Sequence, residues 1–89
     1  MDTTVFETAL TVDGSTGIET VRLEPRPANG LHGHHFAVRG LVLDGAFTVT
    51  HGDTPVTYEP GQVFAVAQGD LHCEAVGAAG ARILVGRKF

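Results

Sequence analysis

Cysteine and positive charge are scarce in this chain of 89 residues. The single cysteine, Cys73, excludes an internal disulfide and fits a reducing compartment. Six Lys and Arg against ten Asp and Glu give a net charge of −4, which argues against nucleic-acid and anionic-membrane partners, because both need clustered positive charge. No hydrophobic run approaches the length of a membrane span, and no signal-peptide pattern opens the chain. We therefore expect a cytoplasmic protein.

The rest of the composition is that of a globular domain. Hydrophobic residues make up 43% of the chain, charged residues 18%, and the 12 glycines indicate many tight turns. This length predicts a single domain over residues 1–89. A chain of this size buries little more than about 60% of its unfolded surface, so we expect a homodimer, in which a second copy adds burial.

Short β-favouring runs separated by Gly and Pro dominate the second half. Asp44-Gly45 predicts a hairpin, and the residues from Gly77 to Gly80 predict a loop. The expected strands are residues 18–23, 38–43, 46–51, 54–58, 63–67, 71–76 and 81–85. Strands this short and this closely spaced predict an all-β fold, an antiparallel sandwich or barrel.

Residues 5–12 leave two structures open. Phe6, Ala9 and Leu10 keep helical spacing, whereas the threonines of the segment favour a strand.

Three of the five histidines lie within four residues, in the sequence His-Gly-His-His from His32 to His35. In an extended segment His32 and His34 point to the same face, because strand side chains alternate with a period of two. Two imidazoles on one face begin a metal site, and a neighbouring strand must supply the third ligand. His72, in the sequence Leu-His-Cys-Glu, is the natural candidate.

These residues resemble the two motifs of the cupin superfamily, over roughly residues 25–86. His32-Gly33-His34 supplies the paired histidines of the first motif, and Gly45 its closing glycine. Gly61, Gly69 and His72 match the second motif, with Ala67 in the place of its usual proline. The resemblance implies a small antiparallel, jelly-roll-like β-barrel with a metal-binding pocket.

The first motif lacks its usual carboxylate ligand. Counting back from Gly45 places Val38 at the motif glutamate, and the next residue, Arg39, has no free lone pair with which to ligate. The resemblance leaves either a centre of His32, His34 and His72 alone or one that Glu74 completes, since Glu74 shares a strand face with His72. Such sets suit one divalent transition metal, namely Fe, Zn, Ni, Mn or Cu.

Each site residue also has a simpler interpretation. The three histidines would, in a degenerate cupin, only form hydrogen bonds in the pocket, and Glu74 would be a surface or ion-pairing residue. His35 points away from its neighbours, although a bulge at Gly33 would exchange His34 and His35. We expect the remaining candidates, His51 and Cys73, to be a solvated turn residue and a small buried residue, respectively.

Two classes of function follow. In the first, the protein is a metalloenzyme of dioxygenase, isomerase or lyase type, which acts on a small organic molecule, with Glu74 as ligand or general base. In the second, it is a non-catalytic module that binds a small molecule or a metal. A cupin without metal, acting as an epimerase or a structural dimer, is a further alternative.

Overall fold

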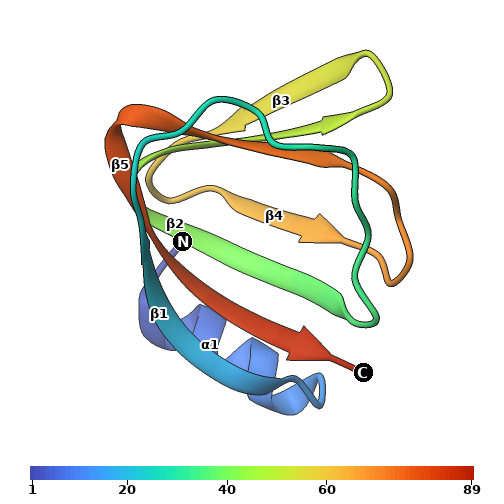
Figure 1. The fold of residues 1–89 in the computed structure, drawn as a ribbon. Helices are drawn as coiled ribbons and strands as arrows, with labels where there is room; N and C mark the ends of the chain where they lie inside the picture. Colours follow the sequence, from blue (N-terminus) through green and yellow to red (C-terminus); the bar gives the residue numbers. More distant parts are fainter.

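The computed structural model describes residues 1–89, which form an antiparallel β-structure with a single helix (Figure 1). In chain order the elements are α1 (Thr3–Val12), β1 (Thr16–Leu23), β2 (Ala37–His51), β3 (Thr54–Tyr58), β4 (Val63–Val66) and β5 (Cys73–Lys88). The predicted all-β class is therefore confirmed, with one short helix added near the N-terminus. No helix combines the length and the apolar character needed to cross a membrane.

The N-terminal segment that left two structures open is the helix α1. Asp2 caps its first turn, because Asp2 Oδ1 accepts a hydrogen bond from the Val5 N–H at 3.1 Å. Phe6 and Leu10 lie about one helical turn apart and are completely buried. The apolar spacing therefore outweighs the β preference of the threonines, which are all exposed.

The two long strands, β2 and β5, pair along most of their length at the centre of the sheet. The strand order is β1-β5-β2-β3, with β4 paired to the first half of β2, and every pairing is antiparallel. Since β1, β3 and β4 each pair with one strand only, the sheet is not closed, which is compatible with the predicted jelly-roll. The homodimer, which would cover one of these edges, stays a prediction.

Two predicted interruptions are wrong, because a single strand continues through each of them. The expected hairpin at Asp44-Gly45 lies inside β2, and the expected loop ending at Gly80 lies inside β5. Gly45 and Gly80 have φ of +78° and +76°, and a Cβ atom on Gly45 would overlap the carbonyl oxygen of Gly80. Close contact between the two glycines lets both strands bend together, while the ladder shifts register and continues.

The sheet is covered on both faces. On the outer face Phe6 and Leu10 of α1 pack against Leu41 and Leu84. The inner face carries the larger core, whose buried members are Val42, Phe47, Val49, Phe64, Val66, Val76, Ala81, Ile83 and Val85. Adjacent strand residues such as Leu41 and Val42 point to opposite faces of the sheet, which is why one strand contributes to both cores. The bend in β2 and β5 curves the sheet around its inner core. The site described next lies at one end of that core.

Candidate metal centre

The segment between β1 and β2 lies along the first half of β5 and positions the histidines (Figure 1). It makes two isolated antiparallel bridges to this part of the chain, Arg26 with Val76 and His32 with His72. His32 and His72 exchange both backbone hydrogen bonds, at 3.0 and 2.9 Å. The two histidines predicted to be partners therefore lie directly opposite one another.

The three imidazoles form one cluster. Ring centroids lie 4.5 Å apart for His32 and His72, 5.3 Å for His34 and His72, and 5.1 Å for His32 and His34. The His34 carbonyl accepts a hydrogen bond from the Gly69 N–H at 2.9 Å, which fixes the segment beyond the bridge. The alternation that places His32 and His34 on one face therefore holds.

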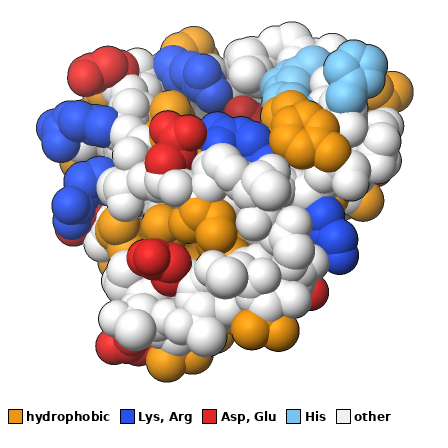
Figure 2. All heavy atoms as spheres, turned by 90° about the horizontal axis from the view of Figure 1, so that it is seen from below, with side chains coloured by type: hydrophobic (Ala, Val, Ile, Leu, Met, Phe, Trp, Pro, Cys, Tyr) orange, Lys and Arg blue, Asp and Glu red, His pale blue; other side chains and the backbone are white.

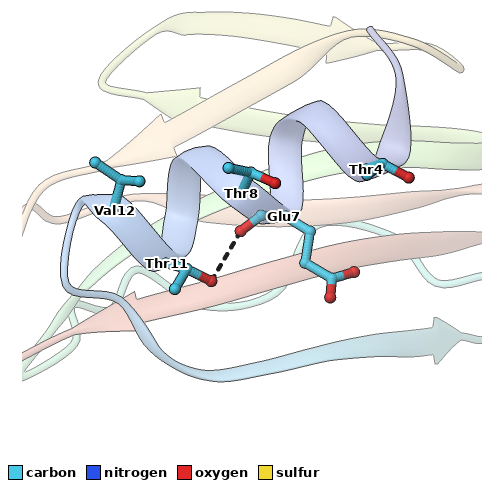
Figure 3. Close-up of a pocket in the computed structure, with 5 residues that line it drawn as sticks. All are labelled: Thr4, Glu7, Thr8, Thr11 and Val12. Atoms are coloured by element: carbon cyan, nitrogen blue, oxygen red, sulfur yellow. Dashed lines mark hydrogen bonds between the residues drawn. The ribbon is translucent and has the colours of Figure 1, made fainter.

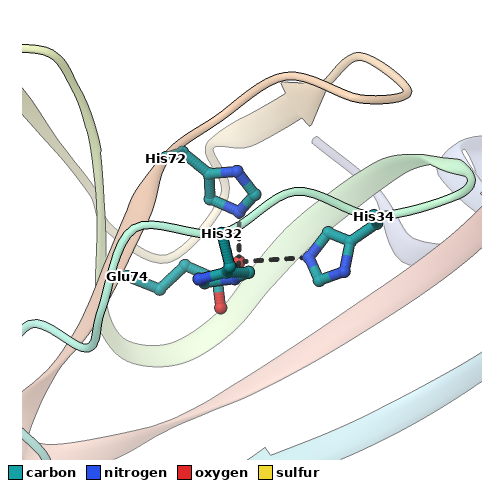
Figure 4. A group of neighbouring side chains, drawn as sticks. All are labelled: His32, His34, His72 and Glu74. Carbon is teal, nitrogen blue, oxygen red and sulfur yellow. Dashed lines mark hydrogen bonds and ion pairs between the residues drawn. The ribbon is translucent and has the colours of Figure 1, made fainter.

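One carboxylate oxygen lies among the three rings (Figure 4). Glu74 Oε2 is 2.7 Å from His72 Nε2, 3.7 Å from His32 Nε2 and 3.8 Å from His34 Nε2. Glu74 comes from β5, two residues beyond His72 and on the same face, as the strand period predicts. The chain therefore supplies at residue 74 the carboxylate that is missing at Val38.

Backbone carbonyls orient two of the rings. His32 Nδ1 lies 2.8 Å from the Gly30 oxygen, and His72 Nδ1 lies 2.9 Å from the Asp70 oxygen. A carbonyl accepts only, so each Nδ1 carries the hydrogen, and each Nε2 faces the centre of the cluster. This arrangement is common in metal sites, where the outer hydrogen bond fixes both the tautomer and the ring orientation.

Two residues of the same segment hold Glu74. Arg26 Nη2 donates to Glu74 Oε1 at 3.3 Å, which leaves Oε2 toward the histidines. Asn29 binds the Glu74 backbone twice, because its Oδ1 accepts the Glu74 N–H at 2.8 Å and its own N–H donates to the Glu74 carbonyl at 3.0 Å. Sequence reasoning missed Arg26 and Asn29, since nothing in the sequence pairs this segment with β5.

The donor set fits a divalent transition metal. One ligand atom from each of His32, His34, His72 and Glu74 can be chosen so that all four lie within 4.8 Å of one another. His72 is fully buried and 18% of the Glu74 side chain is exposed, whereas His32 and His34 are 30% and 29% exposed, so the cluster is open to water on the side of His32 and His34. Three imidazoles with one carboxylate suit Zn, Fe, Mn, Ni and Cu, and the geometry does not select among them.

Other residues considered from the sequence lie outside this cluster. His35 is exposed, so the exchange with His34 by a bulge does not occur. His51 Nε2 pairs with Asp70 Oδ2 at 3.1 Å, and both side chains are more than two-fifths exposed. Cys73 is half-buried and has no disulfide partner.

A small apolar chamber of about 160 Å³ adjoins the histidine cluster. His34 and Glu74 line both, and the Phe36 ring stacks on the His34 ring with centroids 5.1 Å apart. Figure 2 shows histidine side chains gathered at one edge of the molecule beside an apolar side chain. The other lining residues are Val21, Leu23, Val38, Phe47, Phe64, Ile83, Val85 and Arg87. A molecule in this chamber would therefore touch His34 and Glu74, two of the candidate metal ligands.

A larger hollow, of about 270 Å³, runs along the outer side of α1 (Figure 3). Its lining is Thr4, Glu7, Thr8, Thr11 and Val12, and Thr11 Oγ1 donates to the Glu7 carbonyl within it. No set of charged groups converges there, so this hollow has none of the features of a binding site.

Comparisons of sequence alone find no relative, since no family model and no curated protein matches the chain. Solved structures do match. A protein of unknown function from Rhizobium leguminosarum bv. viciae 3841 has a TM-score of 0.73 at 18% identity, over 99% of this chain and 95% of that protein. A cupin-2 domain protein from Shewanella frigidimarina has a TM-score of 0.67 at 16% identity, over 81% of this chain and 69% of that one.

A third match is the oxalate decarboxylase of Bacillus subtilis, a protein with Mn(II) centres. Its TM-score is 0.66 at 24% identity, and the match covers 78% of this chain but only 20% of that one. These likenesses define the class of the protein by its architecture. The chain has the cupin fold, as the two sequence motifs predicted.

Proposed function

We propose that this protein is a metalloenzyme, a small metal-binding cupin that acts on a small organic molecule. The observation that carries this proposal is the convergence of three histidine Nε2 atoms on Glu74 Oε2 beside an apolar chamber. Burying so many polar groups at one place is costly unless each finds a partner. A bound cation satisfies all four donors at once.

His32, His34 and His72 would hold the metal, and Glu74 would complete the set through Oε2. With Oε2 within 3.8 Å of all three nitrogens, ligation by Glu74 has more support than a separate role as general base. The metal would supply Lewis-acid chemistry or, if it is iron, manganese or copper, redox chemistry. Arg26 and Asn29 keep the carboxylate in place.

The chamber supports an organic substrate of modest size. Eight of its 11 lining residues are hydrophobic, so an apolar body would be desolvated beside the metal ligands. A dioxygenase, an isomerase or a lyase would each use such a site. The structural likeness to a decarboxylase with Mn(II) centres supports catalysis on this fold. The fold does not carry over the reaction of that enzyme, because one fold hosts many activities.

The same apolar lining also supports the second candidate, a non-catalytic module for a small molecule or a metal. Only His34, Glu74 and Arg87 offer polar groups to a molecule in the chamber. An enzyme that moves protons commonly needs one such group free of the metal. Turnover of a bound ligand distinguishes the two candidates.

The first test is metal content by elemental mass spectrometry on protein without a histidine tag. The wild-type protein should retain close to one divalent transition ion per chain after dialysis. His34→Ala should weaken retention by about tenfold or more, because one of four ligands is lost. His35→Ala is the matched control, since His35 is the exposed neighbour of a ligand and should retain metal fully.

Equal retention by the wild-type and His34→Ala proteins would contradict a centre built on these residues. A folded wild-type protein that holds no metal after reconstitution with each candidate ion would overturn the proposal. Stoichiometric iron would direct the search to oxygen consumption, and zinc, manganese or nickel to lyase and isomerase assays.

A further inference from the structure

A single arginine faces the apolar chamber from β5. Ile83, Val85 and Arg87 alternate along the strand, and all three line the chamber. Arg87 also pairs in register with Val38, which lines the chamber from β2. Arg87 therefore belongs to the inner surface of the fold, where its inward neighbours on β5 and β2 are aliphatic and the side chain that it contacts on β1 is Glu19. The alternation in the sequence predicts this position, but sequence reasoning did not single it out.

The known contacts of Arg87 use only part of its guanidinium group. Nη1 donates to the Gly17 carbonyl at 2.9 Å and lies 3.3 Å from Glu19 Oε2. The Glu19 side chain is 56% exposed, so solvent screens this ion pair and it is weak. Nε and Nη2 have no acceptor within the protein, although a guanidinium has five donors. Tying β1 to β5 uses Nη1, and because the side chain is 29% exposed, Nε and Nη2 are left for water or a ligand.

We propose that Arg87 binds the anionic group of the substrate, and that the substrate class is a small carboxylic acid with an apolar body. Two parallel hydrogen bonds from a guanidinium match the geometry of a carboxylate, and such charged pairs are among the strongest polar contacts. The remainder of the acid would contact the aliphatic lining, with its far end toward His34. The assignment of this acid as substrate rests on the proposed function, because the metal centre adjoins the chamber.

The volume of the chamber limits the size of this acid. An apolar cavity of roughly 150 Å³ is enough to hold benzene, and the chamber has about 160 Å³. A branched or short-chain acid therefore fits, whereas a long fatty acid does not. The chain carries ten acidic and six basic residues, so an inward arginine also offers a local attraction that the overall charge of −4 does not.

The test uses isobutyrate and its neutral isostere isobutyramide as probes. Each is titrated into metal-free protein and into protein loaded with Zn(II), and the methyl resonances of Val21, Ile83 and Val85 are followed by NMR. Isobutyrate should shift these resonances and should bind at least about tenfold more tightly than the amide. In Arg87→Met the preference for the acid should be lost, whereas Arg82→Met, which changes an exposed arginine on the same strand, should leave it unchanged.

A variant of the partner residue separates binding from support of the fold. Glu19→Gln removes the carboxylate that competes for Arg87, so isobutyrate should bind about twofold more tightly. An arginine that only joins the strands would give no such gain. Equal binding of acid and amide, retained preference in Arg87→Met, or no response to isobutyrate would each overturn the assignment.

The two protein forms separate this inference from the proposed function. An Arg87-dependent preference for the acid in a protein that retains no metal would support the anion site and overturn the metalloenzyme. Full metal retention with no preference for the acid would support the metal centre and overturn the anion site.

Discussion

His72 Nε2 and Glu74 Oε2 lie 2.7 Å apart at a position where the histidine is completely buried. The other ring nitrogen of His72 already faces the Asp70 carbonyl, so it carries a hydrogen. Both atoms therefore turn a free lone pair toward the centre of the cluster. A metal ion at that centre would be held by both side chains at once.

This arrangement predicts that metal binding depends on the Glu74 carboxylate. Zn(II) affinity, measured by competition with a chelator, should fall by about tenfold or more in Glu74→Gln. The amide removes the carboxylate while keeping the shape of the side chain. Equal Zn(II) affinity in the two proteins would contradict ligation by Glu74 Oε2.

Asn29 should affect the metal centre without touching it. In Asn29→Ala the Glu74 N–H loses its acceptor, which costs about 1–3 kcal/mol for a buried group. Because the same contact fixes the backbone that carries the Glu74 side chain, Zn(II) affinity should fall by about tenfold or more. Asn29→Asp keeps an acceptor oxygen and should retain most of the affinity in a competition assay with a chelator. An unchanged affinity in Asn29→Ala would show that Arg26 alone positions Glu74.

The histidines of the site could be predicted from local pattern, because their placement depends on a period of two and on one cross-strand neighbour. His32, His34 and His72 satisfy both requirements, and the structure brings them together. The position of Glu74 follows in the same way from that of His72. What could not be predicted is the long-range pairing of Arg26 and Asn29 with β5, since irregular segments carry no period.

The errors in the fold have a common cause. Asp44-Gly45 is a strong hairpin signal, but a glycine with positive φ also serves a strand that bends. Which of the two occurs depends on Gly80, a residue distant in sequence that lies against Gly45. Local turn chemistry cannot distinguish the two outcomes. Two strands are therefore predicted where the structure has one bent strand, both in β2 and in β5.

The contact between Gly45 and Gly80 predicts that a single methyl group added at Gly45 strongly destabilises the fold. Gly45→Ala adds both a strained backbone and an overlap with the Gly80 carbonyl, so the free energy of unfolding should fall by about 2–5 kcal/mol. Gly52→Ala shares the positive φ but has nothing within 4 Å of its new Cβ, and should cost about 1–2 kcal/mol. Urea unfolding of the two variants measures the difference. Equal costs would mean that β2 and β5 separate easily at the bend.

The helix should stabilise the fold without contributing to the site. Leu10 is completely buried on the outer face of the sheet, so Leu10→Ala should lower the free energy of unfolding by about 2–5 kcal/mol. Val12, which is 82% exposed on the same helix, provides the control, and Val12→Ala should change stability by less than about 0.5 kcal/mol.

The Zn(II) affinity of Leu10→Ala, measured without denaturant where this variant is still folded, should match that of the wild-type protein. The candidate metal ligands come from β5, from the residue just before it and from the segment before β2. His34 and Glu74 line the chamber on the inner face, opposite α1, so the loss of helix packing should not reach them. A matching fall in affinity and stability would show instead that α1 shapes the centre through the sheet.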